Sequence, residues 1–300
     1  MVFAREAATR ASEPNLAIPS TEQPPPKPAP EEGSKESHAS SEKKAQEAES
    51  LDAKTTYEVI RREGEKELER SSDALFWSGL AAGLSMGLSF LGEGLLRSHL
   101  PEAEWRPLVA KLGYSFGFLV VILGSQQLFT ENTLTPMVPL LSKKSRVTLS
   151  NVLRLWAVVL VANLIGTLLF ALALGRLAVV EPQTTHALSD IAREAMRHDW
   201  WTTLLHAIYA GWLVALLVWM LPAAENSKVA VIVIIAWLIG AGGFAHIIAG
   251  ASEVFYAAWR GEATWGQAVF GFILPALIGN MIGGITLVAA LNHAQATSDE

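Results

Sequence analysis

From Ala74 onward, long apolar stretches alternate with short polar connections. Six stretches of 19 residues or more carry no Asp, Glu, Lys or Arg: 74–92, 112–130, 155–175, 200–224, 229–252 and 263–291. At about 1.5 Å of rise per residue, 19 residues give about 28 Å of helix, close to the roughly 30 Å of a hydrocarbon core. The pattern predicts an all-α polytopic membrane protein with six transmembrane helices.

The distribution of charge supports this class. Of the 52 charged residues, 27 fall in residues 1–73, which leaves 25 for the remaining 227. That is about one in nine, against roughly one in four in a soluble domain. The net charge of −6 lies mostly on the tail and gives no reason to expect nucleic acid as a partner. The absence of cysteine excludes disulfides, thiolate metal sites and a thiol nucleophile.

The polar part of the chain precedes the spans. Seven of the fourteen prolines lie before residue 31, so we expect residues 1–45 to be a disordered tail. Residues 46–73 predict a cytoplasmic amphipathic helix, residues 74–292 the six-span domain, and residues 293–300 a short C-terminal tail. Six spans place both termini on one side, and the Lys and Arg distribution favours the cytoplasm.

A motif recurs in the two halves of the span region. The third span contains Asn163-Leu164-Ile165-Gly166 and the sixth contains Asn280-Met281-Ile282-Gly283, 117 residues later. Phe129 and His246 are separated by the same number. A three-span unit that occurs twice must have opposite orientations in the membrane, so the motif predicts an inverted repeat.

The second and fifth spans contain helix breakers. The second ends in a polar run with two glutamines, a glutamate and an asparagine, followed by Pro136 and Pro139. The fifth has four glycines around Phe244 and His246. Irregular backbone at membrane depth is tolerated where it lines a cavity or is buried in protein. If both breaks lie near the midplane, their helix N-termini converge there and favour an anionic solute.

His246 is the candidate central group. A histidine in a glycine-rich span can be a structural hydrogen-bonding residue between helices. It can equally be a titratable group in a solute path that exchanges a proton near neutral pH. Both interpretations remain open at this point.

Three motifs in the right order resemble the formate/nitrite transporter family, over about residues 54–292. They are Leu-Phe-Thr-Glu-Asn at 128–132, Phe-Ala-His-Ile-Ile-Ala at 244–249 and the apolar run at 211–220, and the two Asn-x-Ile-Gly motifs also fit. The glutamate in the first motif and the long charged tail resemble the YfdC-type members of the bacterial inner membrane.

The resemblance implies an aquaporin-like protomer, a homopentamer and passage of small monovalent anions such as formate or nitrite. It implies that His246 is the central histidine, that Thr130 hydrogen-bonds it, and that Arg154 occupies the place of a vestibule lysine. No cofactor is expected. The residues expected along the solute path are Leu128, Phe129, Thr130, Glu131, Asn132, Arg154, Asn163, Phe244, His246, Glu253 and Asn280.

This chain departs from the family pattern at three positions. Glu131 stands where a small residue is usual, Gly250 stands where an asparagine is usual, and Gly211 replaces an asparagine of the fourth span. Glu253 adds a further carboxylate beside the path. Ionised carboxylates would repel an anion, so they are either protonated or paired with a cation, or the solute is not a simple anion.

Four functions follow. The first is transport of a small anion, with a proton exchanged at His246. The second is an aquaporin-like channel for a neutral solute, which the two carboxylates would suit. A membrane enzyme that uses His246 with a carboxylate lacks any nucleophile or cofactor motif. The fourth is a scaffold that acts through its tail.

Overall fold

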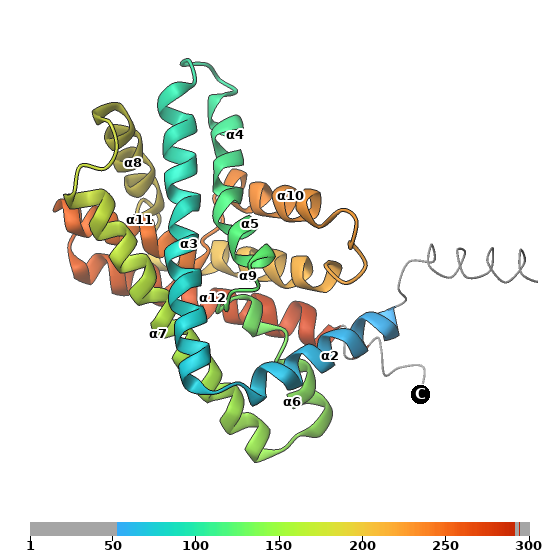
Figure 1. Cartoon of the computed structure of the whole chain (residues 1–300). Coiled ribbons are helices and arrows are strands. Elements are labelled where there is room, and N and C mark those ends of the chain that lie inside the picture. Colours follow the sequence, from blue (N-terminus) through green and yellow to red (C-terminus); the bar gives the residue numbers. More distant parts are fainter. Residues whose placement is uncertain (1–52, 292–293, 295–300) are drawn as a thin grey trace, which may run out of the picture. The chain divides into compact units, whose positions relative to one another are not determined.

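The computed structural model describes residues 53–291 and 294, and the regular elements of this part of the chain are all helices (Figure 1). The tail predicted at 1–45 and residues 46–52, 292, 293 and 295–300 lie outside it. The helices are α2 (Ala53–Glu69), α3 (Ser72–His99), α4 (Arg106–Ala110), η1 (Lys111–Tyr114), α5 (Ser115–Leu123), η2 (Glu131–Thr133), α6 (Met137–Lys143), α7 (Arg146–Arg176), α8 (Pro182–Ala195), α9 (Trp200–Met220), α10 (Lys228–Ala241), α11 (Ile247–Arg260), η3 (Gln267–Ile273), α12 (Leu274–Gly284) and η4 (Ile285–Ala290).

Five helical segments of the described chain are long and apolar enough to cross a membrane. They are α3, the continuous run Arg106–Leu123, α7, α9 and the run Gln267–Gly284. The fifth predicted span, at 229–252, is not one helix: α10 has 14 residues, and the chain bends before α11 begins. The number of uninterrupted membrane-length helices is therefore five where the sequence predicted six spans.

Both predicted breaks are present as irregular backbone. After α5 ends at Leu123, Ser125 adopts a φ of 50°, and helical structure resumes only at η2. After α10 ends at Ala241, Gly243 adopts a φ of 62°, a left-handed conformation that glycine enters without steric cost. The polar and glycine-rich runs thus end their helices where the sequence predicted interruptions.

Two helix pairs form the frame around these breaks. α3 packs along α7, and α9 packs along α12. In each pair a glycine faces an asparagine backbone: a Cβ on Gly83 would collide with Asn163, and a Cβ on Gly211 would collide with Asn280. Small residues at these crossings let the backbones approach closely.

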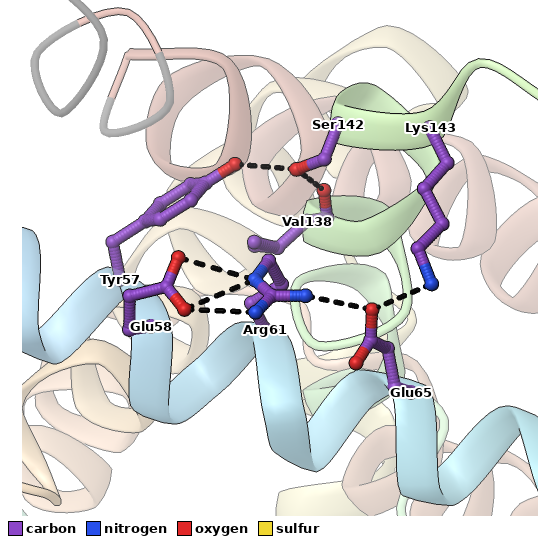
Figure 2. A network of polar contacts seen from close by, with 7 residues as sticks. All are labelled: Tyr57, Glu58, Arg61, Glu65, Val138, Ser142 and Lys143. Carbon is purple, nitrogen blue, oxygen red and sulfur yellow. Dashed lines mark hydrogen bonds and ion pairs between the residues drawn. The ribbon is translucent and has the colours of Figure 1, made fainter.

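α2 lies before the first membrane-length helix and packs on α6 (Figure 2). Its buried side is apolar and includes Ile60, while Gly64 lies against the carbonyl of Thr135. Polar contacts complete the interface: the hydroxyl groups of Tyr57 and Ser142 are 2.8 Å apart, and Lys143 Nζ lies 2.8 Å from Glu65 Oε1. At the opposite end of α3, α8 packs against α3 and α11.

Candidate functional site

Asn163, buried in the middle of α7, holds the first break. Its Oδ1 accepts the N–H of Phe129 at 2.9 Å. Its Nδ2 donates to the carbonyl of Gln127 at 2.9 Å and to that of Gly79 on α3 at 2.7 Å. Backbone groups that leave a helix must find other partners when they are buried. One side chain thus satisfies two of them, and its bond to Gly79 joins the loop to the α3–α7 pair.

Asn280 on α12 repeats this arrangement at the second break. Its Oδ1 accepts the N–H of Ile247 at 2.8 Å, and its Nδ2 donates to the carbonyls of Ala245 and Ala207 at 2.9 and 2.8 Å. The two asparagines are 117 positions apart, but the loop residues they bind, 127 with 245 and 129 with 247, are 118 apart. In hydrogen-bonding terms, the counterpart of His246 is therefore Leu128 rather than the predicted Phe129.

His246 begins α11 as its N-cap. The ring Nδ1 accepts the backbone N–H of Ala249 at 3.1 Å, so Nδ1 carries no proton. In a neutral ring the proton is then on Nε2, which lies 2.8 Å from Thr130 Oγ1 and donates to it. Both residues are buried. The geometry brings together the two residues expected at the centre of the site and fixes the imidazole tautomer.

Apolar side chains surround this pair. The ring of Phe118 packs edge-on against His246 with centroids 5.1 Å apart. Leu128 and Phe129 are buried on the loop that carries Thr130, and Phe129 contacts the ring of Trp156. Phe244 stacks on Tyr209 at 5.2 Å. Polar groups in such an enclosure interact more strongly than they would in water.

A cavity of about 190 Å³ leads from His246 toward α8. Phe244, Gly250 and Glu253 line it near the centre. His198 and His206 line its outer part, with ring centroids 4.7 Å apart. Burial and the neighbouring His206 lower the pKa of His198, which favours its neutral form at pH 7.

The cavity also contains an ion pair that the sequence did not predict. Lys111 of η1 lines the cavity, and its Nζ lies 2.6 Å from Oε1 of the buried Glu93 on α3. In the sequence, Lys111 directly precedes one predicted span and Glu93 directly follows another. No local motif links them, so only the packing of α3 on η1 reveals the pair.

On the side of α2, a polar chain leads away from the first break. Gln127 Nε2 donates to Glu67 Oε2 at 2.7 Å, and Asn132 Nδ2 donates to Gln127 Oε1 at 3.0 Å. Trp156 Nε1 donates to the carbonyl of Asn132 at 2.7 Å. Glu131 Oε1 is buried and has no hydrogen-bond partner among the described residues. Asn132 is thus part of the loop's support, and Glu131 is the unpaired group beside Thr130.

Arg154, the expected vestibule residue, contacts the ends of two helices. Its guanidinium donates to the carbonyl of Leu68 at 2.9 Å and to Ser72 Oγ at 3.3 Å, at the junction of α2 and α3. These contacts direct the cation to helix ends, and it does not line the cavity beside His246. The Lys and Arg side chains that do line this cavity are Lys111 and Arg197. Within the described ranges, no group of three His, Asp or Glu side chains could hold a metal ion.

Comparisons with known proteins give a consistent result. The family model described as "Formate/nitrite transporter" matches residues 54–294. Inner membrane protein YfdC of Escherichia coli K12 is 40% identical over 247 residues, which cover 82% of this chain and 80% of that protein.

Two solved structures share the fold. One described as an FNT family ion channel has a TM-score of 0.69 at 20% identity and covers 81% of this chain and 98% of its own. A pentameric formate channel with formate bound has a TM-score of 0.62 at 21% identity and covers 73% of this chain and 95% of its own.

Proposed function

Because this chain belongs to the formate/nitrite transporter family, in its YfdC-type branch, we propose that it passes small monovalent anions across a bacterial inner membrane. The anions are of the formate and nitrite class, and the protein is a transporter rather than an enzyme. The observation that carries the proposal is the buried pair of His246 and Thr130, where the two helix breaks meet beside a cavity.

The path we propose runs from the cavity past Phe244 to the His246–Thr130 pair and on past Leu128 and Phe129. An anion that enters this apolar enclosure loses hydration, which is costly unless other groups interact with it. The N-terminal end of α11 carries a partial positive charge and lies at His246. It supports an anion at the centre of the path.

We further propose that the anion crosses the narrow region together with a proton, as the uncharged acid. The hydroxyl of Thr130 accepts the Nε2–H of His246 and can donate its own hydrogen to such a species. Because Nδ1 caps α11, His246 can bind a second proton only by giving up that cap. This favours a hydrogen-bonding role for the histidine.

The architecture we propose is six spans in an inverted repeat, with the second and fifth broken and both termini in the cytoplasm. The matching hydrogen bonds of Asn163 and Asn280 support the repeat. The matching close approaches of Gly83 and Gly211 support it independently. We also propose a homopentamer, as in the formate channel that shares the fold.

Flux measurements on the purified protein in liposomes test this function. We expect uptake of formate or nitrite that exceeds the leak of protein-free liposomes and increases as the external pH falls. Stopped-flow light scattering on the same liposomes measures water and glycerol. Fast permeation of water or glycerol without any anion flux would contradict the proposal and show that the protein is a channel for a neutral solute.

A further inference from the structure

Glu253 is the carboxyl group in the cavity that has no partner. It is 8% exposed, lines the cavity, and forms no hydrogen bond or ion pair within 53–291. A carboxylate in such a place is costly unless a cation or hydrogen-bond donors stabilise it. The group is more stable when it carries a proton, and a carboxylic acid is a proton donor.

Two neighbouring carboxyl groups already have cation partners. Lys111 of η1 forms its ion pair with Glu93 of α3 at 2.6 Å. Glu194 of α8 accepts two hydrogen bonds from Arg97 of α3, at 2.7 and 2.9 Å. The other titratable or charged groups that line the cavity are Tyr114, Arg197, His198, His206 and His246, and none of them forms an ion pair or hydrogen bond with Glu253. Of the three carboxyl groups, Glu253 is the one without a cation partner.

Glu253 and His246 lie on one face of α11. They are seven positions apart, which is about two helical turns, and Gly250 lies between them on the same side. Gly250 has no side chain to fill this part of the cavity, where Phe272 lies instead. Because both Glu253 and His246 line the cavity, an anion in it can contact either residue.

We propose that Glu253 is the residue that transfers a proton to the anion in this cavity. The inference rests on the proposed function and assigns the source of the proton. The O–H bond of the protonated carboxyl breaks, and the proton forms an O–H bond with an oxygen of the anion. The neutral acid moves on past His246. Glu253 remains as a carboxylate and takes up a proton from water at the outer end of the cavity.

The test uses the full-length protein in liposomes that contain a pH-sensitive dye, so that formate uptake and proton arrival are measured together. At about pH 6 outside, we expect Glu253→Gln to lower both rates by at least about tenfold and to remove their pH dependence. Glu253→Asp keeps an acid group and should restore a large part of the flux.

Glu194→Gln is the matched control, because it removes one negative charge from the same cavity without removing the proposed donor. Burial raises the pKa of Glu194, but the hydrogen bonds from Arg97 outweigh burial and hold it below its usual value, so this carboxylate stays ionised. We expect Glu194→Gln to keep the pH dependence of the unmodified chain.

The outcomes are separable. If Glu253 only repels anions, Glu253→Gln will transport as fast as the unmodified chain or faster, and the inference is overturned. If the unmodified protein passes no anion at all, the proposed function fails. Reaction with dicyclohexylcarbodiimide gives a second measurement that needs no transport. It labels protonated carboxyls in apolar surroundings, so modification of Glu253 that decreases with rising pH supports the proposal and absence of labelling contradicts it.

Discussion

Two asparagine side chains determine the backbone at the centre of this protein. Asn163 and Asn280 are buried, and each makes two hydrogen bonds to backbone groups of a helix break and a third to a carbonyl within a neighbouring helix. A buried polar group that loses its partner costs about 1–3 kcal/mol. The shape of each break thus depends strongly on one residue.

Asn163→Ala and Asn280→Ala should each lower the free energy of unfolding by about 2–5 kcal/mol, because each leaves two buried backbone groups of a break without their partner. Thermal unfolding of the purified protein in detergent measures the effect. Asn163→Asp keeps the acceptor for the N–H of Phe129 but turns a carboxyl oxygen toward the carbonyls of Gln127 and Gly79, so we expect a loss at least as large as that of the alanine variant. If the alanine variants unfold at the same temperature as the unmodified protein, the conformation of the loops does not depend on these asparagine side chains.

Thr130→Val should lower anion uptake by at least about tenfold with little change in shape, because it leaves the Nε2–H of His246 without an acceptor. Thr130→Ser retains the hydroxyl and is the control, with uptake close to that of the original chain. Equal uptake by the valine and serine variants would remove this hydrogen bond from the path.

At this scale the sequence predicted the residues with distinctive neighbours. The repeated motif identified Asn163 and Asn280, and the glycine-rich break identified His246. It gave no sign of Lys111 and Glu93, which meet only through packing of separate helices. The position of Arg154 in the chain does not say which backbone carbonyl its guanidinium will reach, so its contact with Leu68 was not predicted, and its place in a vestibule stays a prediction.

Among the helices, the sequence predicted the apolar spans better than their ends. The uncharged stretch of the second span runs to residue 130, and its helix ends earlier, at Leu123, where Gly124 and Ser125 begin the predicted break. The connection after α7 was expected to be a loop, whereas it contains the amphipathic helix α8, which begins with a proline at its first position. An apolar run shows that a segment can lie within the membrane. It does not show at which residue the helix, and with it the regular backbone hydrogen bonding, ends.

Gly64→Val should release α2 from α6, since any Cβ at this position meets the carbonyl of Thr135. Trypsin should then cleave after Lys66 and Arg70 more quickly, and amide exchange in α2 should increase. Glu69→Ala, on an exposed position of the same helix, is the control and should leave both rates unchanged. Unchanged protection in the valine variant would mean that the α2–α6 contact is not tight at Gly64.

The polar part of the same interface gives a pH prediction. The hydrogen bond from Lys143 is the main reason that the pKa of Glu65 lies below its ordinary value (Figure 2). A lowered pKa contributes stability above the unfolded value of 4.5, and this is lost as the pH falls through the folded value. For a partly exposed pair the contribution is at most about 1 kcal/mol.

Lys143→Met should therefore increase amide exchange in α2 slightly at about pH 6, and the difference from the original chain should disappear at about pH 3. Exchange rates corrected for the intrinsic effect of pH measure it. A difference that grows on acidification would contradict the assignment.

Across the described chain, the outer surface is apolar over most of its helices. Large exposed side chains include Trp201, Phe270 and Val161. Such a surface is stable against lipid or against another copy of the chain. Fold class was predictable at this scale, because the scarcity of charge after residue 73 leaves few alternatives. The arrangement of copies was implied by the family resemblance and could not be predicted from the apolar pattern, since lipid and protein contacts select the same apolar residues.

Five copies of the 32.4-kDa chain should appear together in native mass spectrometry of the detergent-solubilised protein. The expectation follows from the pentameric formate channel that shares the fold. Cross-linking in native membranes provides the control against detergent effects. A single-copy mass in several detergents, with no cross-linked ladder, would contradict the pentamer.

The hydrogen bonds of Asn163 and Asn280 to the two loops also limit the width of a solute that can pass. To move the two loops that carry Thr130 and His246 apart, the protein would have to break buried hydrogen bonds of Asn163 and Asn280. We therefore expect a bulky carboxylate such as benzoate to be excluded. Because both loops are held in place, we expect the protein to select its solute by width as well as by charge.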